Sequence, residues 1–387
     1  QKVILLSMSS SLQETIPLPT ALHQIFGFKD FRPLQQEAIE ASLNGQDVLV
    51  VMPTGAGKSL CFQLPAALGD GLTLVVSPLV ALMRDQVEAL RALPEFSKIG
   101  VASISSLQDS AEQSMVLDEL ATGQIRLLYV SPERFRSGAF RNILSQVPVE
   151  RFVVDEAHCI SEWGHDFRPD YLQLSGIVES LGKPPLIAVT ATATARVRES
   201  IVRNLGMRQP QTFIGGFNRP NLHYSVHRCK SDAHKLEMLA KALPKLCNKG
   251  GSGLVYAATR KQCEEIAEVA ARALAPHGIR AAAYHAGLDK DSRLELQHLW
   301  QTGEIAVLAA TNAFGMGIDK PDVRFVVHYA HPESLESYYQ EAGRAGRDGR
   351  TSRCVILYHF ADRRLREWFI DNDSMSAADI ETALKLI

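Results

Sequence analysis

Short, wholly apolar runs alternate along the chain with longer segments whose apolar residues recur at helical spacing. In the first half, the runs that predict buried strands are 48–51, 72–76, 125–130, 152–154 and 186–189. Residues 60–68 and 79–90, which lie between such runs, predict helices. Strands buried on both faces and connected by helices are typical of a parallel sheet. The pattern predicts an α/β domain with helices on both faces of a mostly parallel sheet.

The same alternation starts again after the turn-rich stretch 215–221, which predicts a domain boundary. The second set of predicted strands is 254–257, 279–284, 305–309, 323–327 and 354–358. Predicted helices lie at 261–274, which is amphipathic, and at 334–345. We therefore expect two tandem α/β domains. Their bounds are a tail at 1–20, a first domain at 21–214, a second at 215–361, and the start of a polar, helical extension at 362–387.

The composition limits the class of protein but does not indicate a particular function. Hydrophobic residues make up 46% and charged residues 22% of the 387, which is ordinary for a globular protein, and no apolar run is long enough to span a membrane. The net charge of −2 means that any nucleic-acid contact must come from local patches. The six cysteines include no Cys-x-x-Cys pair, so we expect no zinc site and reduced thiols in a cytosolic or nuclear compartment.

A glycine-rich loop follows the first predicted strand and precedes a helix. Glycines let backbone amides approach phosphates, the helix N-terminus adds positive potential, and a lysine neutralises the β- and γ-phosphate charge. A serine at the helix start is a ligand for Mg²⁺. The strict phosphate-loop pattern fails only at its first position, which is Met52. The predicted nucleotide-binding residues are Pro53, Thr54, Gly55, Ala56, Gly57, Lys58 and Ser59, with Ser59 also a predicted Mg²⁺ ligand.

A second candidate site is Asp155-Glu156-Ala157-His158, directly after the apolar run 152–154. A carboxylate at a strand's carboxyl end can hold Mg²⁺, and a second beside it can polarise an attacking water. We assign these roles to Asp155 and Glu156, and treat His158 as a candidate residue for coupling hydrolysis to motion. A lone Asp-Glu pair is often only a solvated strand end, but together with a phosphate loop it predicts nucleotide hydrolysis.

The second domain contributes the run Gln340-Glu341-Ala342-Gly343-Arg344-Ala345-Gly346-Arg347. The two arginines, three residues apart, share a helix face or the loop just after it. An arginine can stabilise the charge on a transferred phosphoryl group. The run is rich in glycine for a surface helix, which favours function over a solvated basic face. We include Gln340, Arg344 and Arg347 among the predicted catalytic residues.

With these motifs in place, residues 22–360 resemble the RecQ family of DNA helicases, which are built from two RecA-like domains. Leu22, Phe26, Gly27, Phe31, Arg32 and Gln35 resemble the motif that precedes the phosphate loop in that family. The resemblance implies that Arg32 and Gln35 recognise adenine, that Phe28 and Asp319 also contact the nucleotide, and that Arg347, ahead of Arg344, is the arginine finger. Residues 190–194 resemble the motif that links hydrolysis to unwinding.

The most family-specific stretch is 161–171, which resembles the aromatic-rich loop that senses DNA. Trp163 and Phe167 offer flat faces for bases, and Arg168 can stack or pair with phosphate. Polar and glycine neighbours predict that Trp163 is partly exposed rather than core. Glu162 stands where the family usually has glutamine. The resemblance implies the following DNA-binding residues: Ser77, Pro78, Trp163, His165, Phe167, Arg168, Thr259, Arg260, His285 and Thr311.

The resemblance implies an ATP-dependent helicase that moves 3′ to 5′ on single strands and unwinds duplexes in recombination and repair. Its cofactors would be ATP and Mg²⁺, and its partners single-stranded and forked DNA, with no membrane association. Fuller family members continue into a four-cysteine zinc subdomain and a winged helix, which this chain lacks or stops before; repair-protein partners would bind such a C-terminal region. The expected location is the bacterial cytoplasm, with the nucleoid, or a eukaryotic nucleus.

Four other functions remain open at this point. The nearest is a DNA-stimulated ATPase that translocates or anneals without unwinding. An RNA helicase is disfavoured by the aromatic-rich loop. A binding scaffold with a dead nucleotide site is disfavoured by the intact Lys58, Asp155, Glu156 and Arg347. A phosphate-loop switch or small-molecule kinase is disfavoured by the second domain.

Overall fold

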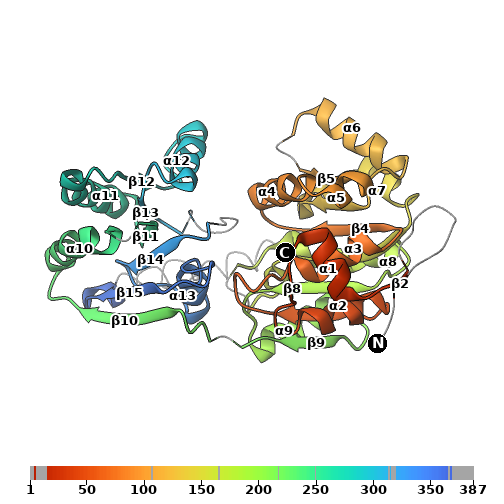
Figure 1. Cartoon of the computed structure of the whole chain (residues 1–387), viewed down its shortest axis with the longest axis horizontal. Helices are drawn as coiled ribbons and strands as arrows, with labels where there is room; N and C mark the ends of the chain where they lie inside the picture. The colour runs from red at the N-terminus through yellow and green to blue at the C-terminus, as the bar shows by residue number, and fades with distance from the viewer. Residues whose placement is uncertain are drawn as a thin grey trace, which may run out of the picture. The chain divides into compact units, whose positions relative to one another are not determined.

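The chain divides into two compact units, Gln1–Asn218 and Arg219–Ile387, and the division falls within the turn-rich stretch 215–221 (Figure 1). The computed structural model describes residues 4–5, 15–105, 108–163, 166–216, 218–248, 250–312, 314, 320–364 and 367. Each unit is an α/β domain.

Unit 1 is built on a seven-stranded sheet in the order β5-β6-β4-β7-β8-β3-β9, with every described pair parallel. Its strands are β3 (Val48–Val51), β4 (Leu72–Val76), β5 (Val101–Ile104), β6 (Leu127–Val130), β7 (Val149–Val154), β8 (Leu186–Thr190) and β9 (Gln211–Ile214). Its helices are α1 (Leu18–Phe26), α2 (Gln35–Leu43), α3 (Leu60–Leu68), α4 (Val80–Arg91), α5 (Pro94–Ile99), α6 (Ser110–Ala121), α7 (Gly138–Leu144), α8 (Leu174–Ser180) and α9 (Ala195–Leu205). A short antiparallel pair, β1 (Ile4–Leu5) with β2 (Thr15–Ile16), precedes them.

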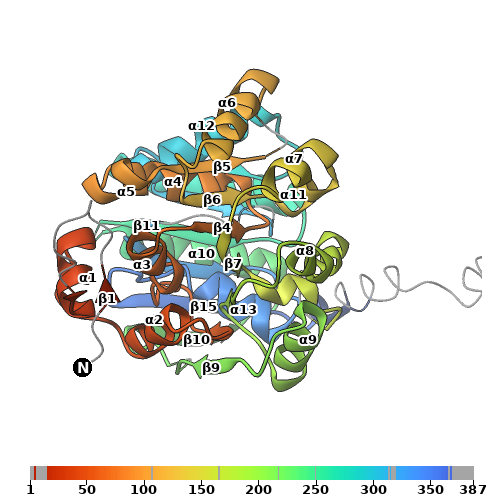
Figure 2. The ribbon, with the colours of Figure 1, turned by 90° about the vertical axis from the view of Figure 1, so that its right-hand side faces the viewer.

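The strand side chains of unit 1 divide between two cores, one on each face of the sheet. Leu49 and Val51 join the cluster that contains residues of α6, α7, α8 and α9, whereas Val48 and Val50 join the cluster that contains residues of α1 to α5. Side chains alternate in direction along a strand, so strands that are apolar throughout can serve both cores. Figure 2 shows α1 and α2 on one flank of this sheet and α8 and α9 on the opposite flank.

Unit 2 repeats the plan on a six-stranded parallel sheet in the order β10-β15-β14-β11-β13-β12. Its strands are β10 (Leu222–Arg228), β11 (Ser252–Tyr256), β12 (Ala281–Tyr284), β13 (Val307–Ala310), β14 (Val323–His328) and β15 (Ser352–Tyr358). Its helices are α10 (Asp232–Cys247), α11 (Arg260–Leu274), α12 (Lys290–Thr302) and α13 (Leu335–Ala342). Residues of α10 and α11 pack on one face, and residues of α12 and α13 on the other.

The predicted fold class is confirmed, and two boundaries are corrected. Helix α1 begins at Leu18, inside the predicted tail 1–20. The Leu18 side chain is buried in the same core cluster as the other apolar side chains of this helix. Helix α13 ends at Ala342, three residues before the predicted end, and a glycine follows it. In the described part of the chain, no helix combines the length and apolar character needed to cross a membrane.

A buried lysine joins three parts of unit 2. Lys235, on α10, is 0% exposed, and its Nζ donates to the Tyr329 carbonyl oxygen at 2.8 Å and to the two Asp362 carboxylate oxygens at 2.6 and 2.7 Å. Tyr329 follows β14 and Asp362 follows β15. The ammonium therefore ties the start of α10 to the residues that follow two central strands.

Replacing Lys235 with methionine is expected to lower the free energy of unfolding by about 3–5 kcal/mol, because it leaves the Asp362 carboxylate without its buried counter-ion. Urea denaturation measures this. The control is Lys241→Met on the same helix, whose ammonium lies 2.5 Å from Glu237 with both side chains exposed, and which should change stability little. Equal losses for the two variants would contradict a structural role for the buried pair.

Candidate active site

The predicted site residues of unit 1 gather at one edge of its sheet. The phosphate loop follows β3, Ser77 and Pro78 follow β4, the Asp155-Glu156 pair follows β7, and residues 191–194 follow β8. These strands are neighbours in the order β4-β7-β8-β3 and all run parallel. The carboxyl ends of parallel strands meet at the same edge, which is where open α/β sheets bind ligands.

The phosphate loop has the backbone geometry that its glycines predict. Gly55 and Gly57 have φ of 81° and 79°, in the left-handed region that favours glycine. A Cβ atom on Gly57 would lie 2.5 Å from the Gln35 side-chain nitrogen. Lys58 Nζ donates to the Met52 carbonyl oxygen at 3.2 Å, within the loop it serves. The loop is thus closely packed against Gln35, and its glycine conformations leave no room for a side chain at Gly57.

Arg32 and Gln35 attach to this loop directly. Gln35 is buried at the start of α2, and its Nε2 donates to the carbonyl oxygens of Gly57 at 2.9 Å and Ala56 at 3.2 Å. The Arg32 guanidinium donates to the Gly55 carbonyl oxygen, and the Arg32 amide donates to Gln35 Oε1 at 2.8 Å. Phe28, just after α1, is exposed and stacks on Phe26 with 9° between the rings. The two residues predicted to recognise adenine, Arg32 and Gln35, thus also contact the phosphate loop.

Met52, the one departure from the strict phosphate-loop pattern, belongs to the core. Its side chain is 1% exposed and packs in the cluster beneath α1 to α5. Its Cγ lies 3.3 Å from where a Cβ of Gly215 would stand. The methionine is thus a core residue, and the departure from the strict pattern does not affect the loop residues 53–59.

Asp155 is held as a metal ligand would be. Ser77 Oγ donates to Asp155 Oδ2 at 3.3 Å, and the Glu156 amide donates to Asp155 Oδ1 at 2.9 Å. Burial and the neighbouring Glu156 carboxylate raise the pKa of Asp155 to about 7, while the Lys58 ammonium lowers it. A carboxyl group must be deprotonated to bind a metal ion, so a cation bound here would displace the proton from Asp155.

Glu156 adopts a backbone conformation that is rare for its type, with φ 47° and ψ 47°. Its Oε2 is buried and accepts no hydrogen bond from the described residues, although His158 Nδ1 lies 3.3 Å away. His158 Nδ1 is also 2.9 Å from Thr190 Oγ1, at the end of β8. The Glu156 carboxylate thus keeps one oxygen that the hydrogen bonds of the described residues leave uncommitted, next to Asp155 at the end of β7.

The residues present fit a nucleotide with Mg²⁺. Ser59 directly precedes α3, next to Lys58, and Lys58 is near enough to Asp155 for its charge to lower that carboxyl's pKa. The positive-φ glycines, the lysine, and the buried carboxylate hydrogen-bonded to Ser77 are the groups that phosphates and a hard cation require.

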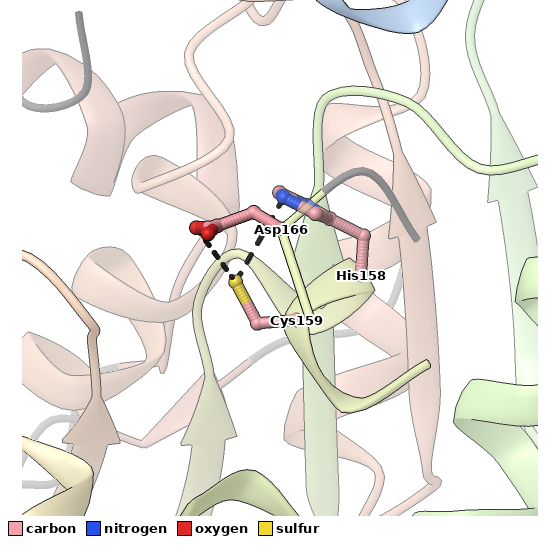
Figure 3. Close-up of side chains that lie close together, drawn as sticks. All are labelled: His158, Cys159 and Asp166. Carbon is pink, nitrogen blue, oxygen red and sulfur yellow. Dashed lines mark hydrogen bonds between the residues drawn. The ribbon is translucent and has the colours of Figure 1, made fainter. Parts of the chain in front are cut away.

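His158, Cys159 and Asp166 form a compact group that joins the Asp-Glu-Ala-His box to the aromatic-rich loop (Figure 3). Cys159 Sγ lies 3.6 Å from Asp166 Oδ2 and 3.8 Å from His158 Nε2. Arg168 Nε donates to the same Asp166 oxygen at 3.1 Å, and Arg168 also donates to the Pro78 carbonyl oxygen at 3.1 Å. The group therefore connects the Asp-Glu-Ala-His box to the aromatic-rich loop and to Pro78. Cys159 and Asp166 were not predicted as site residues, because only the fold brings them together.

The aromatic-rich loop presents one aromatic ring outward. Trp163 is 55% exposed, as predicted, while Phe167 is half-buried. The Arg196 guanidinium carbon lies 3.2 Å above the centre of the Trp163 ring. Arg196 is on α9, directly after the motif at 190–194, and sequence reasoning missed it because nothing in the sequence pairs it with Trp163. The Arg196 guanidinium occupies one flat face of the Trp163 ring.

The predicted DNA-binding residues of unit 2 also gather at one sheet edge. Thr259 and Arg260 follow β11, His285 follows β12 and Thr311 follows β13. Thr259 caps α11, with its Oγ1 accepting from the Gln262 amide at 3.2 Å. A Cβ on Gly287 would lie 3.2 Å from both an Arg260 guanidinium nitrogen and His285 Nδ1, which places these two side chains close together. Buried His285 lies 3.3 Å from Glu264.

The two arginines predicted for catalysis lie in the turn after α13, while Gln340 is on that helix. Arg344 is 5% exposed and hydrogen-bonds Tyr256, the last residue of β11. Burial raises the pKa of Tyr256, and the positive charge of Arg344 lowers it. Arg347 is half-buried. The structure thus makes Arg344 a packed residue of unit 2. The predicted sites at His165 and Asp319, with most of the extension 362–387, lie outside the described residues.

Two family models match the chain. A DEAD/DEAH box helicase model covers residues 32–201, and a helicase conserved C-terminal domain model covers residues 234–349. Among solved structures, the DUF1998 helicase MrfA bound to DNA and AMPPNP matches with a TM-score of 0.72 and 21% identity, over 96% of this chain and 54% of that one. Mss116p bound to single-stranded RNA and AMP-PNP matches with a TM-score of 0.72 and 19% identity, over 89% and 73%. At these identities the structures show a shared fold.

Closer relatives define the family. The ATP-dependent DNA helicase RecQ of Haemophilus influenzae is 45% identical over 92% of this chain and 56% of its own length. That of Pasteurella multocida is 46% identical over 88% and 52%. The probable ATP-dependent DNA helicase RecS of Bacillus subtilis is 39% identical over 96% and 72%. The chain spans about half the length of the two RecQ proteins. On these matches, the chain belongs to the RecQ family of DNA helicases.

Proposed function

We propose that this chain is an ATP-driven motor on DNA, which couples ATP hydrolysis to 3′-to-5′ translocation on a single strand and to duplex unwinding. The observation that supports this best is the connection inside unit 1. The phosphate loop and the Asp155-Glu156 pair share one sheet edge, and the contacts among His158, Cys159, Asp166 and Arg168 link them to the aromatic-rich loop. A protein that only binds a nucleotide has no need of that connection.

In the proposed reaction, Lys58 and the loop amides hold the β- and γ-phosphates, and Arg32 and Gln35 position the base. Mg²⁺ on Ser59 and Asp155 would neutralise phosphate charge. Glu156 accepts a proton from the attacking water through its buried Oε2. Arg347 stabilises the charge that develops on the transferred phosphoryl group, and Gln340 and Arg344 support the turn and helix that carry it.

On the DNA side, we assign backbone contacts to Ser77, Pro78, Arg168, Thr259, Arg260, His285 and Thr311, and base stacking to Trp163. We also assign DNA contacts to the two remaining candidates in the aromatic-rich loop, His165 and Phe167. Binding of this kind depends on phosphates and is weakly selective for sequence and sensitive to salt. We infer that a base stacking on Trp163 displaces the Arg196 guanidinium from the ring. The resulting shift of the aromatic-rich loop would be passed to His158 through Asp166 and Cys159.

Replacing Trp163 with alanine is expected to weaken binding of single-stranded DNA by about 5- to 150-fold, since one base–aromatic stack contributes roughly 1–3 kcal/mol. The rate of ATP hydrolysis at saturating DNA should fall toward the DNA-free rate, because the stack is also the proposed signal. Fluorescence anisotropy with a labelled oligonucleotide and a coupled ATPase assay measure the two effects. Trp163→Phe, which keeps a flat ring, should retain much of both. A Trp163→Ala variant with full DNA stimulation would contradict the assignment.

Unwinding of tailed duplexes tests the proposed function. With ATP and Mg²⁺, a duplex with a 3′ single-stranded tail should be unwound and one with a 5′ tail should not. Displacement of streptavidin from a biotinylated strand end, without unwinding, would favour the alternative of a DNA-stimulated translocase that does not separate strands. Activity on neither substrate would contradict both.

A further inference from the structure

The turn that carries Arg344 and Arg347 begins where α13 ends, at Ala342. The last carbonyl groups of a helix have no partner within it and must be satisfied from elsewhere. In α13 this role falls to the turn that follows, since the amides of Gly343, Arg344 and Ala345 donate to carbonyl oxygens of the helix. Carbonyl groups of the turn itself are bound by the segment 219–221, which opens unit 2 and is separated from the turn by more than 120 residues of chain.

Arg219 binds three carbonyl oxygens of the turn. One guanidinium nitrogen donates to Gly343 at 3.3 Å, and the other donates to Ala345 at 3.0 Å and Gly346 at 2.8 Å. A guanidinium is planar and presents its donors in a fixed fork, so several bonds to one turn also fix its orientation. Its positive charge is favourable beside a helix C-terminus.

Asn221 holds the same turn from a second point. Its Nδ2 donates to the carbonyl oxygens of Gly346 at 2.8 Å and Arg350 at 3.0 Å. Gly346 has φ 58°, and a Cβ there would lie 2.5 Å from Asn221 Nδ2 and 2.8 Å from the Arg350 oxygen. The position accepts only glycine, because both its backbone angle and its surroundings exclude a side chain.

The sheet supports the turn from the other side. The Gly346 amide donates to the Val323 carbonyl oxygen at 2.8 Å, and Ser352 Oγ donates to the same oxygen at 3.1 Å. Val323 begins β14 and Ser352 begins β15. Gly346 is therefore fixed through both its amide and its carbonyl group, and the next residue in the chain is Arg347.

We propose that Arg219 and Asn221 are positioning residues for Arg347. They would hold the turn, and with it the backbone of Arg347, in a single conformation. This inference rests on the proposed role of Arg347. Neither residue was predicted from the sequence as more than part of a turn-rich boundary.

The test compares Arg219→Ala, Arg219→Lys, Arg347→Ala and the double variant Arg219→Ala/Arg347→Ala in DNA-stimulated ATP hydrolysis. Misplacement of a catalytic group by about 1 Å can cost about 100-fold, so we expect Arg219→Ala to lower kcat by about 10- to 100-fold with little change in KM for ATP. Arg219→Lys should recover part of the rate. The double variant should be no slower than Arg347→Ala, because a misplaced and an absent side chain have the same consequence. Arg353→Ala, an exposed arginine on β15, is the control.

Nucleotide binding distinguishes a positioning role of Arg219 from a loss of structure in the Arg219→Ala variant. Arg219→Ala should bind AMP-PNP as the parent does but bind ADP with aluminium fluoride, which mimics the transferred phosphoryl group, more weakly. Equal weakening for both nucleotides, or rate losses that multiply in the double variant, would overturn the positioning role. Should Arg347→Ala be slow while Arg219→Ala is normal, this inference alone fails. An Arg347→Ala variant at full rate would overturn the arginine finger itself.

Discussion

Replacing Arg347 with alanine is expected to lower kcat for DNA-stimulated ATP hydrolysis by about 10³- to 10⁵-fold, the range that an arginine finger contributes in phosphoryl transfer. KM for ATP should change far less, because the guanidinium acts on charge that develops only in the transition state. Steady-state hydrolysis at saturating single-stranded DNA measures both constants. The turn that carries Arg347 is held by backbone and side-chain hydrogen bonds at Gly346, so the substitution removes the charge without disturbing its support.

Arg350→Ala is the matched control for that result. Arg350 lies three residues further along the same turn with its side chain 83% exposed, so its removal should leave kcat near the parent value. Equal rates for the Arg347 and Arg350 variants would show that Arg347 is not the arginine finger, and Arg344 would then be tested next. Arg344→Ala is a weaker test, because Arg344 packs against Tyr256 and its loss would also destabilise unit 2.

Replacing Glu156 with glutamine is expected to lower kcat by about 10²- to 10⁴-fold, the usual contribution of a general base. Glutamine has nearly the shape of glutamate but cannot accept a proton from water at neutral pH. ATP binding should persist, because Lys58 and the loop amides are unchanged. The variant should therefore bind a fluorescent ATP analogue with an affinity close to the parent's while failing to hydrolyse ATP.

Glu199→Gln, an exposed position on α9, makes the same chemical change away from the site and should have no effect on kcat. If Glu156→Gln hydrolysed ATP at the parent rate, the water would have to be activated elsewhere, and the role given to the buried Oε2 would be wrong. If it lost ATP binding as well, the residue would be serving the nucleotide pocket rather than the chemical step.

The sheet strands were predictable from the sequence because strands buried on both faces are apolar throughout. The runs 48–51 and 72–76 match β3 and β4 residue for residue. Edge strands such as β9 and β10 were not predicted, since most of their side chains are exposed and carry no such signal. Helix α13 was predicted too long because Ala345 looks helical, while the hydrogen bonds from Arg219 that stabilise a turn there come from a distant part of the chain.

The candidate site was predictable where its functional side chains are consecutive in the sequence. The phosphate loop and the Asp155-Glu156 pair each follow a strand, so their meeting at one sheet edge follows from the topology. Contacts between residues that are not consecutive had no such signal. The stacking of Arg196 on Trp163 and the approach of Cys159 to Asp166 depend on the path of the chain between them.

Hydrolysis of ATP with Mg²⁺, measured with and without single-stranded DNA, tests whether DNA at the aromatic-rich loop switches on the phosphate site of unit 1. We expect slow hydrolysis alone, strong stimulation by single-stranded DNA, weaker stimulation by RNA of the same sequence, and loss of stimulation on Trp163→Ala. Hydrolysis at the same rate with and without DNA would contradict the coupling through Arg168, Asp166, Cys159 and His158, and with it the motor proposed here.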